Sequence, residues 1–129
     1  APPNGQITDG LDQSRKLGAI GDSAVVEALG LGAMNIIQSP EQMKVLGDFL
    51  PADFADRIMT LRGCGHFDFR LAKPSIGITA RSIHDYGAGM LVALGIIDSE
   101  GDLGRIGGGI FDPPMAPFMS ALAALGDAK

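Results

Sequence analysis

The sequence predicts an α+β fold, with helices in the N-terminal half, a short mixed sheet or hairpin in the C-terminal half, and a closing helix. Apolar residues recur at helical spacing between residues 23 and 61. Two apolar segments, 90–97 and 103–111, flank a polar turn as in a β-hairpin. An Ala-rich helix, 113–125, then ends the chain. An α/β arrangement is the alternative.

Length and composition favour one domain. A chain of 129 residues with 46% hydrophobic residues is large enough for an apolar core. Residues 1–18 contain prolines and glycines without a period, which predicts an extended arm, and we expect residues 19–129 to form a single α+β domain. The first residue is not Met, which indicates a trimmed chain or a piece of a longer one.

Charge and composition argue against several classes of protein. The net charge of −5 gives no general attraction to nucleic acid, whose binding rests on clustered Lys and Arg. No apolar run reaches the roughly 18 residues that cross a bilayer, and the first residues lack the features of a signal peptide. Cys64 is the only cysteine, so an internal disulfide is excluded. We therefore expect a cytoplasmic protein without a nucleic-acid or membrane partner.

Three helices are expected in the N-terminal half. Asp22 or Ser23 fits the N-cap of the first. The second begins at Ser39–Glu41, which supplies a cap, a proline at the first helical position and an acid in the first turn. The third spans 51–61. Their expected buried residues are Val25, Val26, Leu29, Met34, Met43, Leu46, Phe49 or Leu50, Phe54, Ile58 and Leu61, and the expected solvent face of the third helix carries Asp53, Asp56 and Arg57.

The C-terminal half carries the strand patterns. Residues 64–71 alternate with a period of two, which predicts a half-buried strand with its phenylalanines facing inward. Residues 76–79 form a second candidate strand, and the pattern of 82–89 is ambiguous. The segment 90–97 is a buried strand or a short helix, and the polar turn 98–102 follows it.

The segment 18–30 has a chemical interpretation beside a structural one. A helix N-terminus next to glycines presents unpaired backbone N–H groups and the positive end of a dipole to an anion. In the structural alternative, Asp22 or Ser23 only caps a packing helix. Asp22 and Glu27 would repel an anion, unless one caps the helix and the other orients a ligand N–H group or a metal.

A second candidate site is the segment 104–109, which holds more glycine than a strand favours. Such runs occur where backbone closely approaches a ligand or another strand. Arg105 beside them is suited to bind a carboxylate or phosphate through two hydrogen bonds. A bulged hairpin with a solvent-facing arginine is the alternative. The run matches neither a phosphate-binding loop nor a dinucleotide fingerprint.

Cysteine and histidine support weaker hypotheses. On a strand, Cys64 and His66 would share a face, and a neighbouring His activates a thiolate, but a lone Cys is more often a small buried residue. A tetrahedral metal site needs further ligands, so no metal or other cofactor is expected. His84 and Asp85 are residue types of an acid/base pair, yet sequence neighbours point in different directions, which favours an ordinary loop histidine.

The stretches GDSAVVEALGLGAMN at 21–35 and GIIDSEGDLGRIGGGIFDPP at 95–114 resemble the C-terminal part of the YlbE-type proteins. This uncharacterised family accompanies FdrA-like proteins related to succinyl-CoA synthetase, and the resemblance spans most of the chain. Because such proteins are several hundred residues long, the resemblance implies a segment joined to a larger polypeptide or accompanied by a second subunit, in an oligomer.

The resemblance also implies a function. The family is linked to anaerobic purine and allantoin breakdown, and its members look like one subunit of an oxamate carbamoyltransferase system that converts oxalurate and phosphate to oxamate and carbamoyl phosphate. We therefore expect a carbamoyltransferase-type subunit with a small anionic substrate. The motif positions that carry over are Gly21, Asp22, Ser23, Glu27, Arg105, Gly107, Gly108 and Gly109, and the family gives none of them an established catalytic role. From their chemistry, our candidate catalytic residues are Asp22, Glu27 and Arg105, and our candidate substrate-binding residues are Gly21, Ser23, Gly107, Gly108 and Gly109.

Two departures from the family pattern, and one alternative function, stand beside this expectation. The pattern places a histidine where Asp98 stands, and the segment 75–94 is longer than in the family. If that histidine is catalytic in relatives, this chain has changed substrate or lost activity. The alternative is a noncatalytic interface module, whose glycines permit close packing against a larger chain. A third hypothesis makes Cys64 a nucleophile.

Overall fold

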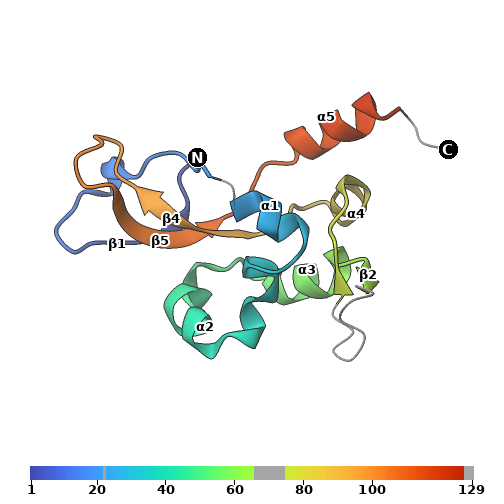
Figure 1. Ribbon diagram of the computed structural model, residues 1–129, viewed down its shortest axis with the longest axis horizontal. Helices are drawn as coiled ribbons and strands as arrows, with labels where there is room; N and C mark the ends of the chain where they lie inside the picture. Colours follow the sequence, from blue (N-terminus) through green and yellow to red (C-terminus); the bar gives the residue numbers. More distant parts are fainter. Residues whose placement is uncertain (22, 66–74, 127–129) are drawn as a thin grey trace.

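The computed structural model, which describes residues 1–21, 23–65 and 75–126, confirms the α+β fold. Figure 1 shows the sheet at one end, the short helices beside it, and the last helix extending away from the body. The elements are β1 (Asn4–Ile7), η1 (Gln13–Arg15), α1 (Ser23–Ala28), η2 (Ala33–Gln38), α2 (Pro40–Leu46), η3 (Gly47–Phe49), α3 (Phe54–Leu61), β2 (Cys64–Gly65), β3 (Ser75–Ile76), α4 (Ala80–Tyr86), β4 (Val92–Ile97), β5 (Arg105–Phe111) and α5 (Ala116–Ala124).

The expected hairpin is present as the antiparallel pair β4 and β5. This pairing makes the segment 90–97 a strand rather than a helix. Strand β1 joins the other edge of β5, also antiparallel, so the order in the sheet is β1-β5-β4. Residues 4–7 of the predicted arm are therefore part of the sheet, and the domain boundary at residue 18 stays a prediction.

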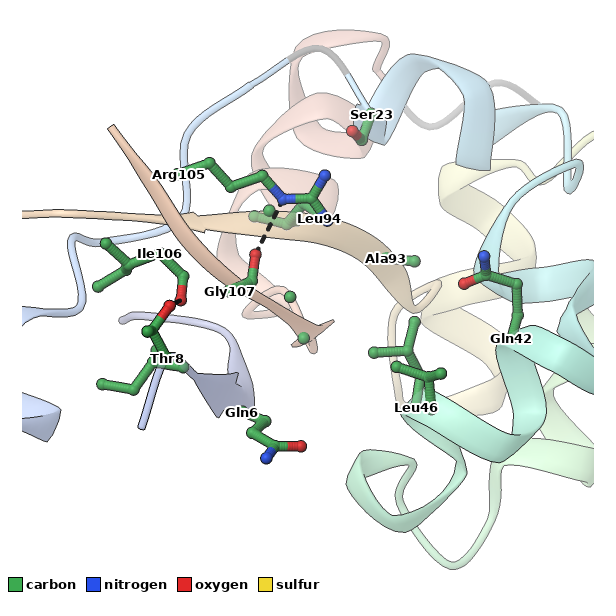
Figure 2. A pocket seen from close by; sticks show the side chains of 15 residues that line it. Gln6, Thr8, Ser23, Gln42, Leu46, Ala93, Leu94, Arg105, Ile106 and Gly107 are labelled. Atoms are coloured by element: carbon green, nitrogen blue, oxygen red, sulfur yellow. Dashed lines mark hydrogen bonds between the residues drawn. The ribbon is translucent and has the colours of Figure 1, made fainter. Parts of the chain in front are cut away.

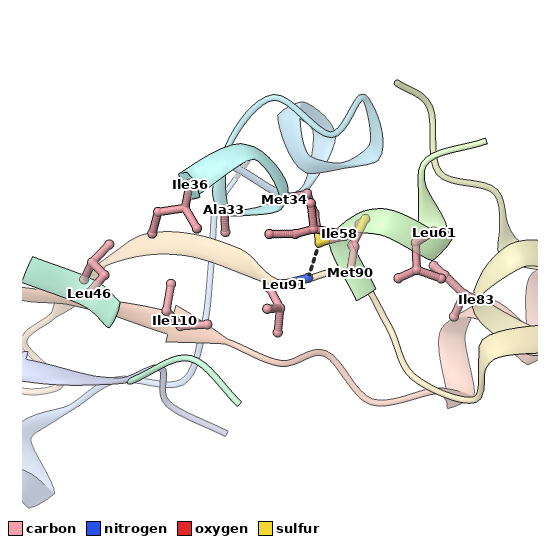
Figure 3. Close-up of a cluster of buried hydrophobic side chains, with 10 residues drawn as sticks. All are labelled: Ala33, Met34, Ile36, Leu46, Ile58, Leu61, Ile83, Met90, Leu91 and Ile110. Carbon is pink, nitrogen blue, oxygen red and sulfur yellow. Dashed lines mark hydrogen bonds between the residues drawn. The ribbon is translucent and has the colours of Figure 1, made fainter. Parts of the chain in front are cut away.

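The main apolar core lies between the helices and the strands. Ten buried side chains form it (Figure 3), and Met34, Ile58 and Leu61 are fully enclosed, as their helical spacing predicts. The whole cluster is Ala33, Met34, Ile36, Leu46, Ile58, Leu61, Ile83, Met90, Leu91 and Ile110. A second, smaller cluster at the far end of the sheet contains Ile7, Ile96 and Ile106.

The predicted buried face of α1 is wrong. Val25, Val26 and Leu29 are 70%, 48% and 49% exposed, whereas Glu27 is only 2% exposed. The Glu27 carboxylate accepts hydrogen bonds from backbone N–H groups at the start of η2. Because these bonds turn the Glu27 side of α1 toward the body, the apolar side is left at the surface.

The predicted solvent position of Arg57 on α3 is also wrong. Its side chain is 7% exposed and ties three segments together. The guanidinium donates two hydrogen bonds to the Asp112 carboxylate at 2.8 and 2.9 Å, one to Asp53 Oδ2 at 2.8 Å and one to the Gly89 carbonyl at 3.1 Å. Asp112 lies 55 positions along the chain, so a local pattern does not indicate this burial.

Three further segments differ from their predictions or extend them. The ambiguous segment contains α4, which a capping box between Thr79 and Ser82 starts and Gly87 ends with φ +86°. His84 is therefore on a helix rather than a loop, and its Nδ1 lies 2.8 Å from Asp85 Oδ1 at the surface.

Within the predicted strand 64–71, β2 covers two residues and the rest lies outside the described residues. No helix in the described ranges is long and apolar enough to cross a membrane.

Candidate functional site

A pocket of about 560 Å³ lies against the central hairpin and gathers several predicted site residues. Ser23 comes from the first turn of α1, Gln42 from α2, and Arg105 from the start of β5. Figure 2 shows the Arg105 side chain over the strands, with Ser23 and Gln42 on the elements around it. The other lining residues are Gln6, Ile7, Thr8, Val45, Leu46, Ala93, Leu94, Gly95, Ile106, Gly107, Gly108 and Gly109.

Arg105 lies across a surface made of glycine. A Cβ atom at Gly95 would stand 3.0 Å from Arg105 Nε, and one at Gly108 would stand 3.6 Å from Nη2. The Nε group donates a hydrogen bond to the Gly107 carbonyl at 3.0 Å, which holds the guanidinium over the hairpin. The absence of a side chain at Gly95 thus leaves room for this position of the cation in the pocket, whereas a Cβ atom at Gly108 would make only ordinary contact with it.

Gly107 and Gly109 serve a second purpose. A Cβ atom at Gly107 would collide with the Gln6 carbonyl, and one at Gly109 with the Asn4 carbonyl. These two positions therefore permit the close approach of β1 to β5. The glycine run combines close strand contact at Gly107 and Gly109 with an open surface under Arg105 at Gly108.

Arg105 differs from Arg15 and Arg57 in its partners. Arg15 and Arg57 each form ion pairs with carboxylates. Among the described residues, the hydrogen-bond partner of the Arg105 side chain is a backbone carbonyl, and the side chain is exposed. The guanidinium nitrogens beyond Nε therefore face the pocket with donors suited to the oxygens of a carboxylate or phosphate.

Glu27 and Gly21 lie outside this pocket. The Glu27 carboxylate accepts hydrogen bonds from the N–H groups of Ala33 and, at 3.1 Å, Met34. Burial raises the pKa of Glu27, and these backbone hydrogen bonds oppose the increase. Gly21 instead lines a separate apolar groove. Asp22 lies outside the described residues, and α1 has only six residues, so its dipole is small.

Asp98, where the resemblance led us to expect a histidine, stabilises the turn between β4 and β5. Its carboxylate accepts hydrogen bonds from Arg15 at 2.9 and 2.6 Å. The N–H groups of Glu100 and Leu103 donate to the same carboxylate. The hydrogen bond from Arg15 lowers the pKa of Asp98 to about 2, which keeps the carboxylate ionised. This residue is absent from the pocket lining, so its contacts are structural.

Sequence reasoning missed three polar residues of the pocket. Gln6 and Thr8 enter through the pairing of β1 with β5, and Gln42 enters because α2 packs beside the hairpin. No motif marks these residues, because the chain brings them to Arg105 only through tertiary contacts. The weaker candidates add little: the side chain of Cys64 and all of His66 lie outside the described residues, and the described residues contain no group of three metal-binding side chains.

Comparisons with known proteins find a sequence relative and a structural neighbour, and no family model matches. The chain is 28% identical, over 97% of its length, to "Oxamate carbamoyltransferase subunit AllG" of Escherichia coli (strain K12), and spans 32% of that protein. It superposes with a TM-score of 0.79 and 23% identity on a conserved protein of unknown function from Enterococcus faecalis V583, covering 96% of this chain and 31% of that one. The chain thus spans about a third of each relative's length.

Proposed function

We propose that this chain is a segment or subunit of a carbamoyltransferase-type enzyme that handles small carboxylate or amide substrates, such as oxalurate or oxamate, and phosphate. The observation that carries the proposal is Arg105, held over a glycine surface in an open pocket with a backbone carbonyl as its partner. The similarity to a subunit named for oxamate carbamoyltransferase supports the substrate class. The same proposal includes a role in purine breakdown, a cytoplasmic location and assembly into an oligomer.

In this proposal the pocket binds an oxyanion through Arg105. The guanidinium supplies two parallel hydrogen bonds to carboxylate or phosphate oxygens and stabilises negative charge that develops during transfer. The Ser23 hydroxyl and the Gln42 amide line the same pocket and are suited to hydrogen-bond an amide or carbonyl group of the substrate. Gly95 keeps space for the guanidinium, while Glu27 acts on the fold rather than on the substrate.

The test is turnover by the complete enzyme that contains this chain, with oxalurate and phosphate as substrates. Arg105→Ala should lower kcat/KM roughly 10- to 100-fold, because a charge-assisted hydrogen bond contributes about 1.5–3 kcal/mol. Arg105→Lys should recover only part of the loss, since Lys lacks the planar fork. Arg81→Ala removes an exposed arginine of α4 that does not line the pocket and should leave turnover unchanged. Equal activity of Arg105→Ala and the unmodified enzyme would overturn the proposal.

A further inference from the structure

Helix α5 is apolar on every side but lacks a buried residue. Its sequence, APFMSALAA, contains no charged group. A helix that is hydrophobic all round is normally buried. In Figure 1 α5 extends from the body, and its contacts are mainly with α4. In this chain alone, the apolar surface of α5 is therefore exposed to water, which is unfavourable.

An apolar groove of about 340 Å³ runs from the start of α5 to the beginning of α1. We call it the α5 groove, and its lining includes Ile20, Ala24, Leu94, Phe111 and Phe118. No lining residue is charged. Ile20 is 61% exposed, and the large apolar side chains of α1 next to Ala24 are exposed as well. Groove and helix together form a continuous apolar region without a charged residue.

We propose that this chain is part of a longer polypeptide, as in the proposed function, and that the α5 groove docks an apolar segment of that polypeptide. Uncharged apolar surfaces are typical of permanent interfaces rather than transient ones. Both relatives carry roughly two thirds of their length outside the matching region. A covalently joined segment has a high effective concentration beside the groove, so it covers the surface continuously. The inference concerns assembly, and it stands or falls independently of carbamoyl transfer in the Arg105 pocket.

The experiment places a photo-crosslinking amino acid at Ile20 in the intact native protein, prepared as a mixture of ¹⁴N- and ¹⁵N-labelled copies. Met59 on α3, which is 72% exposed and outside the groove, is the matched control position. We expect several-fold more product at position 20 than at position 59, joined within one copy to a residue outside these 129 positions.

Three results would overturn the inference. Mixed-isotope products that join Ile20 to residues 1–129 of a second copy would assign the groove to self-association. Equal, low yields at both positions would show that the groove is open to solvent. An intact mass of the native protein equal to these 129 residues would remove the proposed occupant.

Discussion

Arg105 begins strand β5 and Arg57 binds Asp112, directly after the same strand, yet their surroundings assign them opposite roles. Arg57 is buried, and its donors are used by two carboxylates and one carbonyl. Arg105 is exposed, and its side chain donates to one backbone carbonyl among the described residues. The comparison indicates that the partners of an arginine, more than its position in the sequence, separate a structural cation from one available to a ligand.

The largest expected effect on stability is that of Arg57→Ala. It should lower the free energy of unfolding by about 3 kcal/mol, because the Gly89 carbonyl and the Asp112 carboxylate lose their donors. Arg105→Ala is the matched control and should change stability by less than about 0.5 kcal/mol, since its side chain is exposed. Urea denaturation measures both, and equal losses would break the comparison.

Two glycines of the same hairpin should separate stability from binding. Gly107→Ala should cost about 2 kcal/mol, because its Cβ collides with the Gln6 carbonyl and displaces β1. At Gly95→Ala the three nearest atoms to the new Cβ belong to the Arg105 side chain, which can move, so this variant should cost less than about 1 kcal/mol while weakening anion binding. Thermal unfolding measures the stability of both variants, and phosphate titration measures their anion binding. Equal losses of stability and of phosphate affinity in the two variants would contradict the assignment of Gly107 to strand contact and of Gly95 to the surface under Arg105.

The ion pair between Arg15 and Asp98 should make the free energy of unfolding depend on pH in the acid range. The hydrogen bond from Arg15 lowers the pKa of Asp98 to about 2 from 3.8, so the stability it adds is present above pH 4. That contribution should disappear as pH falls from about 4 to 2, when the carboxylate protonates. Asp98→Asn should therefore be less stable at neutral pH and lose less stability in this range. An unchanged acid dependence would contradict the role of this pair.

The sequence predicts the elements that local rules determine. The cap, proline and acid at Ser39–Glu41 locate α2, and the polar turn 98–102 locates the β4–β5 hairpin. The glycine run at 104–109 is correctly linked to close strand approach, although the partner strand β1 is not identifiable from its pattern. The Thr79–Ser82 pair is a local capping signal that could have identified α4.

Tertiary partners explain what sequence patterns missed. The side of α1 that carries Glu27 is buried, rather than the apolar side, because backbone N–H groups at the start of η2 donate hydrogen bonds to the Glu27 carboxylate. Arg57 is buried because Asp112 arrives from beyond β5. Likewise, Gln42 reaches the pocket only through the packing of α2. In each case hydrophobic periodicity does not indicate the position of the side chain, because the contact that determines it joins residues from different elements.

The most direct test of the central claim is an NMR titration of the arginine Nε–H resonances with oxamate and with inorganic phosphate. The account predicts a saturable shift at Arg105, whose Nε–H is held by the Gly107 carbonyl, and no comparable shift at the exposed Arg81. Loss of the amide responses of Gly95 and Gly108 in Arg105→Ala would place the anion over the glycine surface. Identical small shifts at both arginines, or none at Arg105, would contradict the account.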